Sequence, residues 1–327
     1  MKRNYYLRTG LFFAFLILSS IGVAQTYTFT AASAAGPNGP SQALADIEYA
    51  GTTLDGNVTV TAGIQYWVVP TTGVYLIEAF GGQGFGTFGG RGAQISGEFN
   101  LTAGTTLKIL VGQMAPPPVG SLNQFAGGGG SFVTTTANSP YIVAGGGGGN
   151  HGASYVTTSD ASITNNGYAG VAGNSGAGGT AGSGGASASS ADAGGGLLGN
   201  GGGIGGGFSF INGGVGGAGT TNGHGEGGFG CGGGTSSWDN FRAGGGGGYS
   251  GGGGAGENGQ INAPAAGGGG SFNSGTSPVN IAGVQTGNGI VIITNQCAPG
   301  IGSLAGDVAS LPDVTEDCVS NPTAPTA

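Results

Sequence analysis

Runs of consecutive glycines constrain this chain more than any other feature of its sequence. Residues 141–152 read YIVAGGGGGNHG, so an apolar, β-like stretch leads directly into five glycines. Glycine accounts for 83 of the 327 residues, without the strict three-residue period and abundant proline of collagen. Only 6% of the residues are charged, whereas soluble disordered chains are usually rich in charge. The glycines therefore indicate an ordered but unusual architecture. Runs of similar length recur at Gly127–Gly130, Gly244–Gly248, Gly251–Gly254 and Gly267–Gly270.

A phosphate-binding loop is one alternative for such glycines. A P-loop requires a lysine directly after its glycines, and no lysine follows any of these runs. The dinucleotide pattern G-x-G-x-x-G is matched by Gly84, Gly86 and Gly89, but a sequence this rich in glycine produces such matches by chance. The helix that the dinucleotide motif needs is not predicted after them. Nucleotide binding is therefore not expected, and no cofactor is predicted.

A flexible linker is a second alternative, because glycine chains are mobile. Apolar β-type blocks such as YIVA and VIIT border the runs, however, and linkers rarely carry them. We favour an interpretation in which each run forms a left-handed extended helix with three residues per turn and no internal hydrogen bonds. Buried backbone groups need partners, so such helices must bond to one another, and a Cβ atom would hold their backbones apart. The glycines expected to have this structural role include Gly127, Gly145, Gly147, Gly149, Gly246, Gly252 and Gly268.

The two ends of the chain differ from its glycine-rich part. Residues 1–24 combine a basic start, an apolar segment and a small-residue cleavage site, which is the pattern of a secretory signal peptide. Residues 25–297 are predicted to form one glycine-rich domain, and residues 298–327 read as a linker and the start of an Ig-like repeat. The mature chain is expected to be secreted or held at the cell surface, without inserting into a membrane.

Charge excludes one class of partner. Cleavage of the signal peptide removes three of the six basic residues and leaves 14 acidic ones, a net charge of −11. Such a surface repels phosphate backbones, so a nucleic-acid partner is not expected.

The apolar blocks predict β-strands and no helix after the leader. The predicted strands are Tyr27–Thr30, Ile64–Val69, Val74–Phe80, Ala93–Phe99, Thr106–Val111, Tyr141–Ala144 and Gly289–Thr294. The turn Pro70–Gly73 and the turn at Ala103-Gly104 each suggest a hairpin. The last strand is expected to return to the sheet that begins near residue 27. Residues 126–146 and 266–283 echo each other, each with a glycine run, Ser-Phe, a polar turn, Ser-Pro and an apolar strand.

These segments together resemble a known family. The stretches YTFTAASAAGPNGPSQALADIEYAG, GIQYWVVPTTGVYLIEAFGGQG, GEFNLTAGTTLKILVGQ, SPYIVAGGGGG and GGFGCGGGTSS are similar to the extracellular glycine-rich domain of anaplastic lymphoma kinase and leukocyte tyrosine kinase. The resemblance covers about residues 26–297. It implies an all-β fold, a tumour-necrosis-factor-like β-sandwich with an inserted bundle of polyglycine type II helices, and binding of a small protein ligand. The kinase segments H-R-D and D-F-G do not occur in this sequence, so no kinase activity follows from the resemblance.

Few residues suggest a chemical site. His224, Glu226 and Cys231 lie close together but lack a paired metal motif, so no metal site is predicted, and no catalytic constellation is visible. An aromatic and basic insert, with Trp238, Phe241, Arg242 and Tyr249, carries residue types that are enriched at interaction hot spots. The alternative is that Trp238 and Phe241 cover the edge of the sandwich as core.

Three cysteines in an exported chain allow one disulfide and leave one thiol over. Cys231 with Cys297 is one pairing that the sequence leaves open, with Cys318 pairing elsewhere. Both Cys231 and Cys297 are expected to be structural.

The sequence thus predicts a non-catalytic extracellular binding or adhesion module with an extracellular protein or glycan as partner. Two alternatives remain open, the ligand-binding ectodomain of a receptor tyrosine kinase-like protein and a structural matrix or fibre-tip protein.

Overall fold

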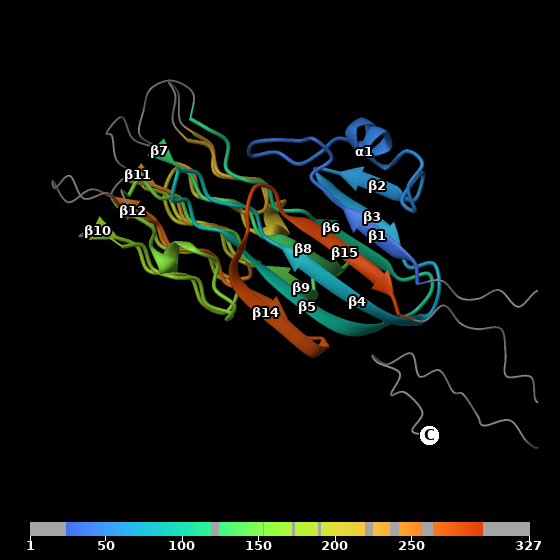
Figure 1. The fold of residues 1–327 in the computed structure, drawn as a ribbon. Coiled ribbons are helices and arrows are strands. Elements are labelled where there is room, and N and C mark those ends of the chain that lie inside the picture. The colour runs from blue at the N-terminus through green and yellow to red at the C-terminus, as the bar shows by residue number, and fades with distance from the viewer. Residues whose placement is uncertain are drawn as a thin grey trace, which may run out of the picture.

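The computed structural model describes residues 24–118, 124–152, 154–171, 174–188, 191–219, 225–235, 242–256 and 264–296. Residues 1–23 of the predicted signal peptide, and all residues after 296, including the predicted linker and Ig-like start at 298–327, lie outside the described residues. Within them the chain is almost entirely β-structure, arranged as a sandwich of two sheets with the glycine-rich part extending beyond it (Figure 1). The predicted all-β sandwich is therefore confirmed.

One sheet of the sandwich has five antiparallel strands. Their order is β1 (Thr26–Phe29), β15 (Ile290–Asn295), β4 (Gly73–Phe80), β5 (Gly92–Leu101) and β14 (Thr276–Gln285). The last strand of the described chain pairs with the first, with Phe29 opposite Val291. This pairing confirms the predicted return of the chain to the sheet that begins near residue 27.

The second sheet has six strands. Their order is β13 (Phe272–Asn273), β9 (Pro140–Ala144), β8 (Ser131–Thr135), β6 (Thr106–Leu110), β3 (Ile64–Val68) and β2 (Val58–Thr61). The first copy of the echoed sequence forms the β8–β9 pair inside this sheet. The second copy is divided, because β13 pairs with β9 whereas β14 pairs with β5 in the other sheet.

Both predicted hairpins are wrong. The strands that flank Pro70–Gly73 are β3 and β4, and they belong to different sheets, as do β5 and β6 on either side of Gly104. These turns carry the chain from one sheet to the other at one end of the sandwich. They lie side by side, since Val69 donates to the Thr105 carbonyl oxygen at 2.9 Å and accepts from the Gly104 N–H at 2.9 Å.

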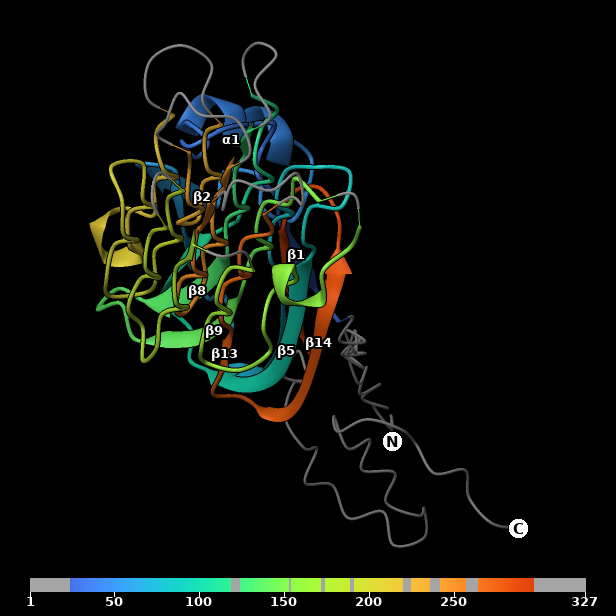
Figure 2. The same ribbon diagram turned by 90° about the vertical axis from the view of Figure 1, so that its left-hand side faces the viewer.

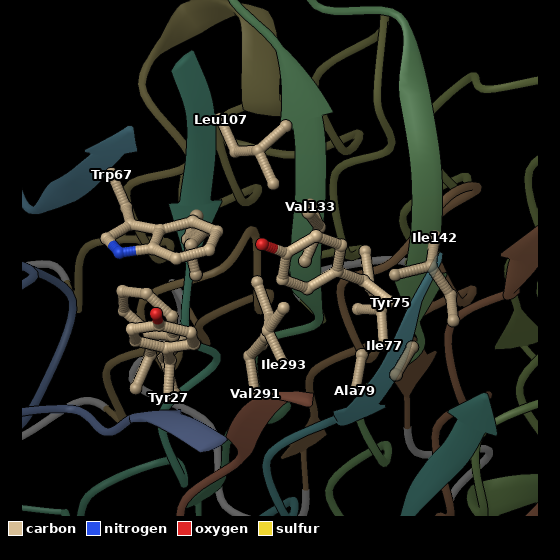
Figure 3. Close-up of a cluster of buried hydrophobic side chains, with 14 of the residues drawn as sticks. Tyr27, Trp67, Tyr75, Ile77, Ala79, Leu107, Val133, Ile142, Val291 and Ile293 are labelled. Atoms are coloured by element: carbon tan, nitrogen blue, oxygen red, sulfur yellow. The ribbon is translucent and has the colours of Figure 1, made fainter. Parts of the chain in front are cut away.

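The core of the sandwich lies between the two sheets (Figure 3). Alternate residues of β4 and β15 point inward, among them Ile77 and Ile293, and meet residues of the opposite sheet such as Leu107. The Trp67 indole packs against Tyr27 with ring centroids 4.6 Å apart. This alternation is the signature that the apolar blocks carried in the sequence.

One helix was not predicted, α1 (Gln42–Tyr49). Its start is marked by Ser41, whose hydroxyl oxygen accepts a hydrogen bond from the Leu44 N–H at 3.3 Å. Ala45 and Tyr49, one turn apart, are its buried residues. The helix is short and has only this narrow apolar stripe, so its periodicity is weak, but the N-cap serine is a recognisable signal.

A second core joins the six-stranded sheet to the glycine-rich part. The face of this sheet that points away from the sandwich core is also apolar, with Ile64, Leu110, Phe132 and Val143 buried on it. They pack against residues of the glycine-rich part, namely Leu197, Phe210, Phe229 and Cys231. Figure 2, with the glycine-rich end toward the viewer, shows the runs as a bundle of side-by-side segments.

The far end of the glycine-rich part carries short strands. A small sheet has the order β10 (Asn174–Ser175), β12 (Ala255–Gly256), β11 (Arg242–Ala243) and β7 (Gln124–Phe125) (Figure 1). Two single-turn 3₁₀ helices, Thr157–Ser159 and Phe210–Asn212, complete the elements. The glycine runs thus connect a β-sandwich at one end to a small sheet at the other.

Candidate partner-binding surface

The glycine runs bond to one another through their backbones with a repeat of three residues. Gly244 and Gly247 donate hydrogen bonds to Phe125 and Gly128, which are themselves three residues apart. Gly245 and Gly248 likewise donate to Asp192 and Gly195, at 3.0 and 3.3 Å. Three residues per turn would produce this repeat. The polyglycine type II helix itself stays a prediction, which this pattern of partners supports.

The run from Gly145 to Gly149, which follows directly from β9, has the same repeat. Gly146 and Gly149 donate to Gly247 and Gly244, so these two runs are antiparallel. Their carbonyl oxygens accept from Gly269 and Ala266, again three residues apart. The run is therefore enclosed by backbone on several sides, and its five residues are all buried.

The seven glycines that the sequence singled out all lie in close backbone contact with other segments. A Cβ atom added to any of them would lie within 3.0 Å of a backbone carbonyl oxygen, a distance that real Cβ atoms essentially never show. The nearest oxygens belong to Gly245 for Gly127, Gly269 for Gly145, Gly90 for Gly147, Phe125 for Gly149, Gly146 for Gly246, Gly267 for Gly252 and Asp160 for Gly268. The bundle consequently has the rigidity of a packed interior.

The predicted aromatic and basic insert is only partly described. Trp238 and Phe241, as well as His224, lie outside the described residues. Arg242 begins β11 and is buried, with 6% of its surface exposed. Tyr249 is half-buried and stacks on Phe272, with ring centroids 4.9 Å apart, beside the second core. Arg242 and Tyr249 thus lie at opposite ends of the run Gly244–Gly248 and do not form one binding surface.

Cys231 is a free thiol in this structure, so the pairing with Cys297 that the sequence left open is wrong for it. Its side chain is fully buried in the second core, and its Sγ lies 3.9 Å from the Gly196 carbonyl oxygen. Burial raises the pKa of the Cys231 thiol well above its ordinary value of 9.0. Its structural role is that of a small apolar core residue. Cys297 and Cys318 lie outside the described residues.

Large apolar side chains are exposed on the glycine-rich part. We call Leu198, Ile204, Phe208 and Ile211 the apolar rim; their exposed fractions are 54%, 87%, 46% and 44%. Exposed apolar side chains grouped on neighbouring segments are typical of interaction surfaces. This group is the feature of the glycine-rich part that best fits a partner.

Hydrogen bonds hold the segments of the apolar rim against each other. The Ile211 N–H donates to the Leu197 carbonyl oxygen at 3.1 Å, which places Ile211 next to the turn that bears Leu198. The Asn200 side chain accepts from the Ser209 N–H at 2.8 Å. Beneath the rim, Leu197 and Phe210 are buried in the second core. The rim is therefore presented on a rigid base.

Sequence reasoning missed the apolar rim. Its signal is an isolated large apolar residue between glycines, as at Ile204 in GGGIGGGF. Such a residue belongs to no periodic pattern, so it is not expected to be core. Phe229 also stands alone between glycines, in GGFG, yet it is fully buried, so this pattern does not by itself distinguish an exposed side chain from a buried one.

Two other kinds of site are absent from the part of the chain that the structure describes. It contains no group of three or more histidine, cysteine, aspartate or glutamate side chains that could hold a metal ion. No helix in the described ranges has the length and apolar character of a membrane span.

Comparison with known proteins finds a partial similarity to a receptor. No family model matches the chain. Over 108 residues, 28% of the chain, it is 37% identical to the leukocyte tyrosine kinase receptor of Mus musculus. The matched part covers only 11% of that receptor, so the chain spans a small fraction of its length. Part of this all-β chain is thus similar to a segment of a leukocyte tyrosine kinase receptor.

Proposed function

We propose that this chain is a non-catalytic extracellular binding module that holds a partner protein against the apolar rim. The observation that carries the proposal is the exposure of Ile204 and Phe208 on a bundle whose backbone is bonded internally. A rigid surface loses little conformational entropy on binding, so apolar contacts made there contribute efficiently to affinity. The similarity to a receptor and the predicted signal peptide support an extracellular location.

The net charge of the mature chain, −11 without its signal peptide, adds a preference among partners. An acidic surface accelerates the approach of basic proteins and repels acidic ones. We therefore expect the partner to be a basic extracellular protein with an apolar patch of its own.

The test compares two double variants of the secreted chain. Ile204→Ser with Phe208→Ser removes apolar area from the rim, whereas Ile47→Ser with Val68→Ser removes exposed apolar residues from α1 and β3 as a matched control. Each protein is screened by surface plasmon resonance against a panel of purified basic extracellular proteins. A partner bound by the parent and the control, and at least tenfold more weakly by the rim variant, supports the proposal. Equal loss in both variants, or no partner on the panel, contradicts it.

A receptor ectodomain is the second candidate, and the similarity to the mouse receptor favours it. The reading frame beyond Ala327 distinguishes the two. A membrane span followed by a kinase domain would support the receptor, whereas further extracellular repeats would contradict it.

A further inference from the structure

Arg91 differs from the other basic residues of the described chain. Lys108 is half-buried, donates to the Asn138 side chain and lies over the Phe210 ring at 5.0 Å from its centroid. Arg242 is buried. Arg91 is exposed. On a strongly acidic chain, this side chain is an exposed positive charge.

Arg91 lines a pocket of about 380 Å³. Three segments form its walls, and the remaining lining residues are Gln83, Thr87, Phe88, Gly89, Tyr155 and Thr286. The lining therefore combines a guanidinium with two aromatic rings and two threonines. Thr87, Tyr155 and Thr286 are exposed residues.

The walls of this pocket are bonded to one another. The Gln83 N–H donates to the Gly287 carbonyl oxygen at 2.8 Å, and the Gly287 N–H donates to Gln83 Oε1 at 3.0 Å. Gly84 donates to the Gly90 carbonyl oxygen at 2.9 Å and closes the loop from β4 to β5. The pocket is thus formed before any ligand binds, which lowers the entropic cost of binding.

The carboxylate of Asp160 contacts the backbone of Arg91 and is not part of the pocket lining. Asp160 is buried, with 7% of its surface exposed, and it does not line the pocket. One of its oxygens accepts from the backbone N–H of Arg91 at 2.8 Å, and the other accepts from the Tyr155 hydroxyl. Asp160 therefore fixes the Arg91 backbone and the Tyr155 ring.

We propose that this pocket binds one carboxylate-bearing sugar unit of an extracellular glycan. A guanidinium pairs with a carboxylate through two parallel hydrogen bonds, which is the strongest polar contact available to such a sugar. Aromatic rings accept the apolar face of a sugar ring, and threonine hydroxyls pair with its hydroxyl groups. An acidic peptide needs a longer groove and further positive charges, and the pocket offers a single arginine. This site is separate from the apolar rim.

The experiment uses the full chain and defined sugars. Binding of 3′-sialyllactose, of a glucuronate-containing disaccharide and of lactose is measured by NMR titration, with an acidic peptide as a fourth probe. At least one acidic sugar is expected to bind at least tenfold more tightly than lactose, and added salt is expected to weaken it. The two acidic sugars distinguish a sialic acid from a uronic acid as the source of the carboxylate. Equal binding of lactose, binding of the peptide alone, or no binding of any probe overturns the proposal.

Variants assign the binding to Arg91. Arg91→Gln is expected to weaken the acidic sugar at least tenfold, and Arg91→Lys to retain part of the affinity. Arg91→Gln combined with Asp46→Lys adds positive charge at an exposed position on α1, outside the pocket lining, and should not restore binding. Unchanged affinity of Arg91→Gln for the acidic sugar, with an unchanged melting temperature, would contradict the proposal. The apolar-rim double variant should bind the sugar as the parent does. The proposal of a sugar site and the proposal of a partner at the apolar rim can therefore fail independently of each other.

Discussion

The ring of Phe210 stacks on the ring of Phe132, with centroids 4.8 Å apart and an angle of 24° between their planes. Phe132 belongs to β8, and Phe210 belongs to the glycine-rich part, so this pair joins the two halves of the described molecule. Both side chains are fully buried, and the Lys108 ammonium lies over the Phe210 ring, 5.0 Å from its centroid. The bundle is therefore anchored to the sandwich by side chains as well as by the continuous runs of backbone.

Phe210→Ala should destabilise the chain by about 3–5 kcal/mol, because it opens a cavity in the second core. Phe208→Ala, two residues away, is the matched control, and since its ring is 46% exposed it should cost less than about 1 kcal/mol. Urea denaturation followed by tyrosine and tryptophan fluorescence measures both. Similar losses in the two variants would show that the stacked pair does not anchor the bundle.

Gly147→Ala should be among the most harmful single changes in the chain. The added methyl group would overlap the Gly90 carbonyl oxygen, and backbone cannot move aside without breaking further hydrogen bonds. We expect a loss of more than about 4 kcal/mol or failure to fold. Gly213→Ala is the control, because its φ of 101° is strained for alanine but no atom lies within 4 Å of the added group. That strain alone should cost about 1–2 kcal/mol, and equal effects in a thermal melt would contradict the close-packing argument.

The predicted strand ranges match seven of the longer strands but leave out β2, β8 and β14, and the pairing of the strands was predicted poorly. Val74–Phe80 and Gly289–Thr294 have a clear apolar character, and both match strands within one residue at each end. A turn such as Pro70–Gly73 reverses the chain, but nothing local determines whether the next strand joins the same sheet. That choice depends on the many residues that form the two apolar faces, which a local pattern cannot reveal.

The structural role of the glycine-rich part could be predicted from the sequence. Which of its side chains form the surface could not. The need of buried glycine backbone for partners follows from hydrogen-bond physics, and the repeat at Gly244 and Gly247 is consistent with it. Which large side chains stay exposed depends on how the runs are ordered in space. Ile204 and Arg91 therefore could not be recognised as surface features from their neighbours in the sequence.

Tyr49→Phe should weaken the attachment of α1 to the sandwich. The Tyr49 hydroxyl donates to Gln65 Oε1 at 2.6 Å and accepts from the Thr30 N–H at 3.1 Å, and both Tyr49 and Gln65 are buried. Removing the hydroxyl leaves the buried Gln65 Oε1 without this donor and the half-buried Thr30 N–H without this acceptor, at a cost of about 1–3 kcal/mol. Adding Gln65→Leu removes one of those partners and should cost less than the two single changes together. Additive losses in a double-mutant cycle, measured by urea denaturation, would show that the hydroxyl and the amide act independently.

Cys231 should be unreactive in the folded protein. Its thiol is fully buried, and burial raises its pKa, so neither access nor thiolate is available at neutral pH. Iodoacetamide labelling with peptide mapping by mass spectrometry checks this for Cys231 separately from the other cysteines. We expect labelling at Cys231 only after denaturant is added. Labelling in the folded state at a rate comparable to that of a free thiol would contradict the buried, reduced state.

The same burial makes the chain sensitive to alkali. The pKa values of Cys231, Tyr27 and Tyr49 are all raised in the folded state, with burial as the main cause in each case. A group with a raised folded pKa loses its proton more readily when the chain unfolds, so these groups reduce stability only above their ordinary values of 9.0 and 10.0. The free energy of unfolding should therefore be insensitive to these groups below about pH 8 and should fall steadily above about pH 9. Cys231→Ala should make the first part of this fall shallower, because only the tyrosines then contribute. Urea denaturation at a series of pH values measures the slope, and an unchanged slope in Cys231→Ala would show that the thiol is not the first group to titrate.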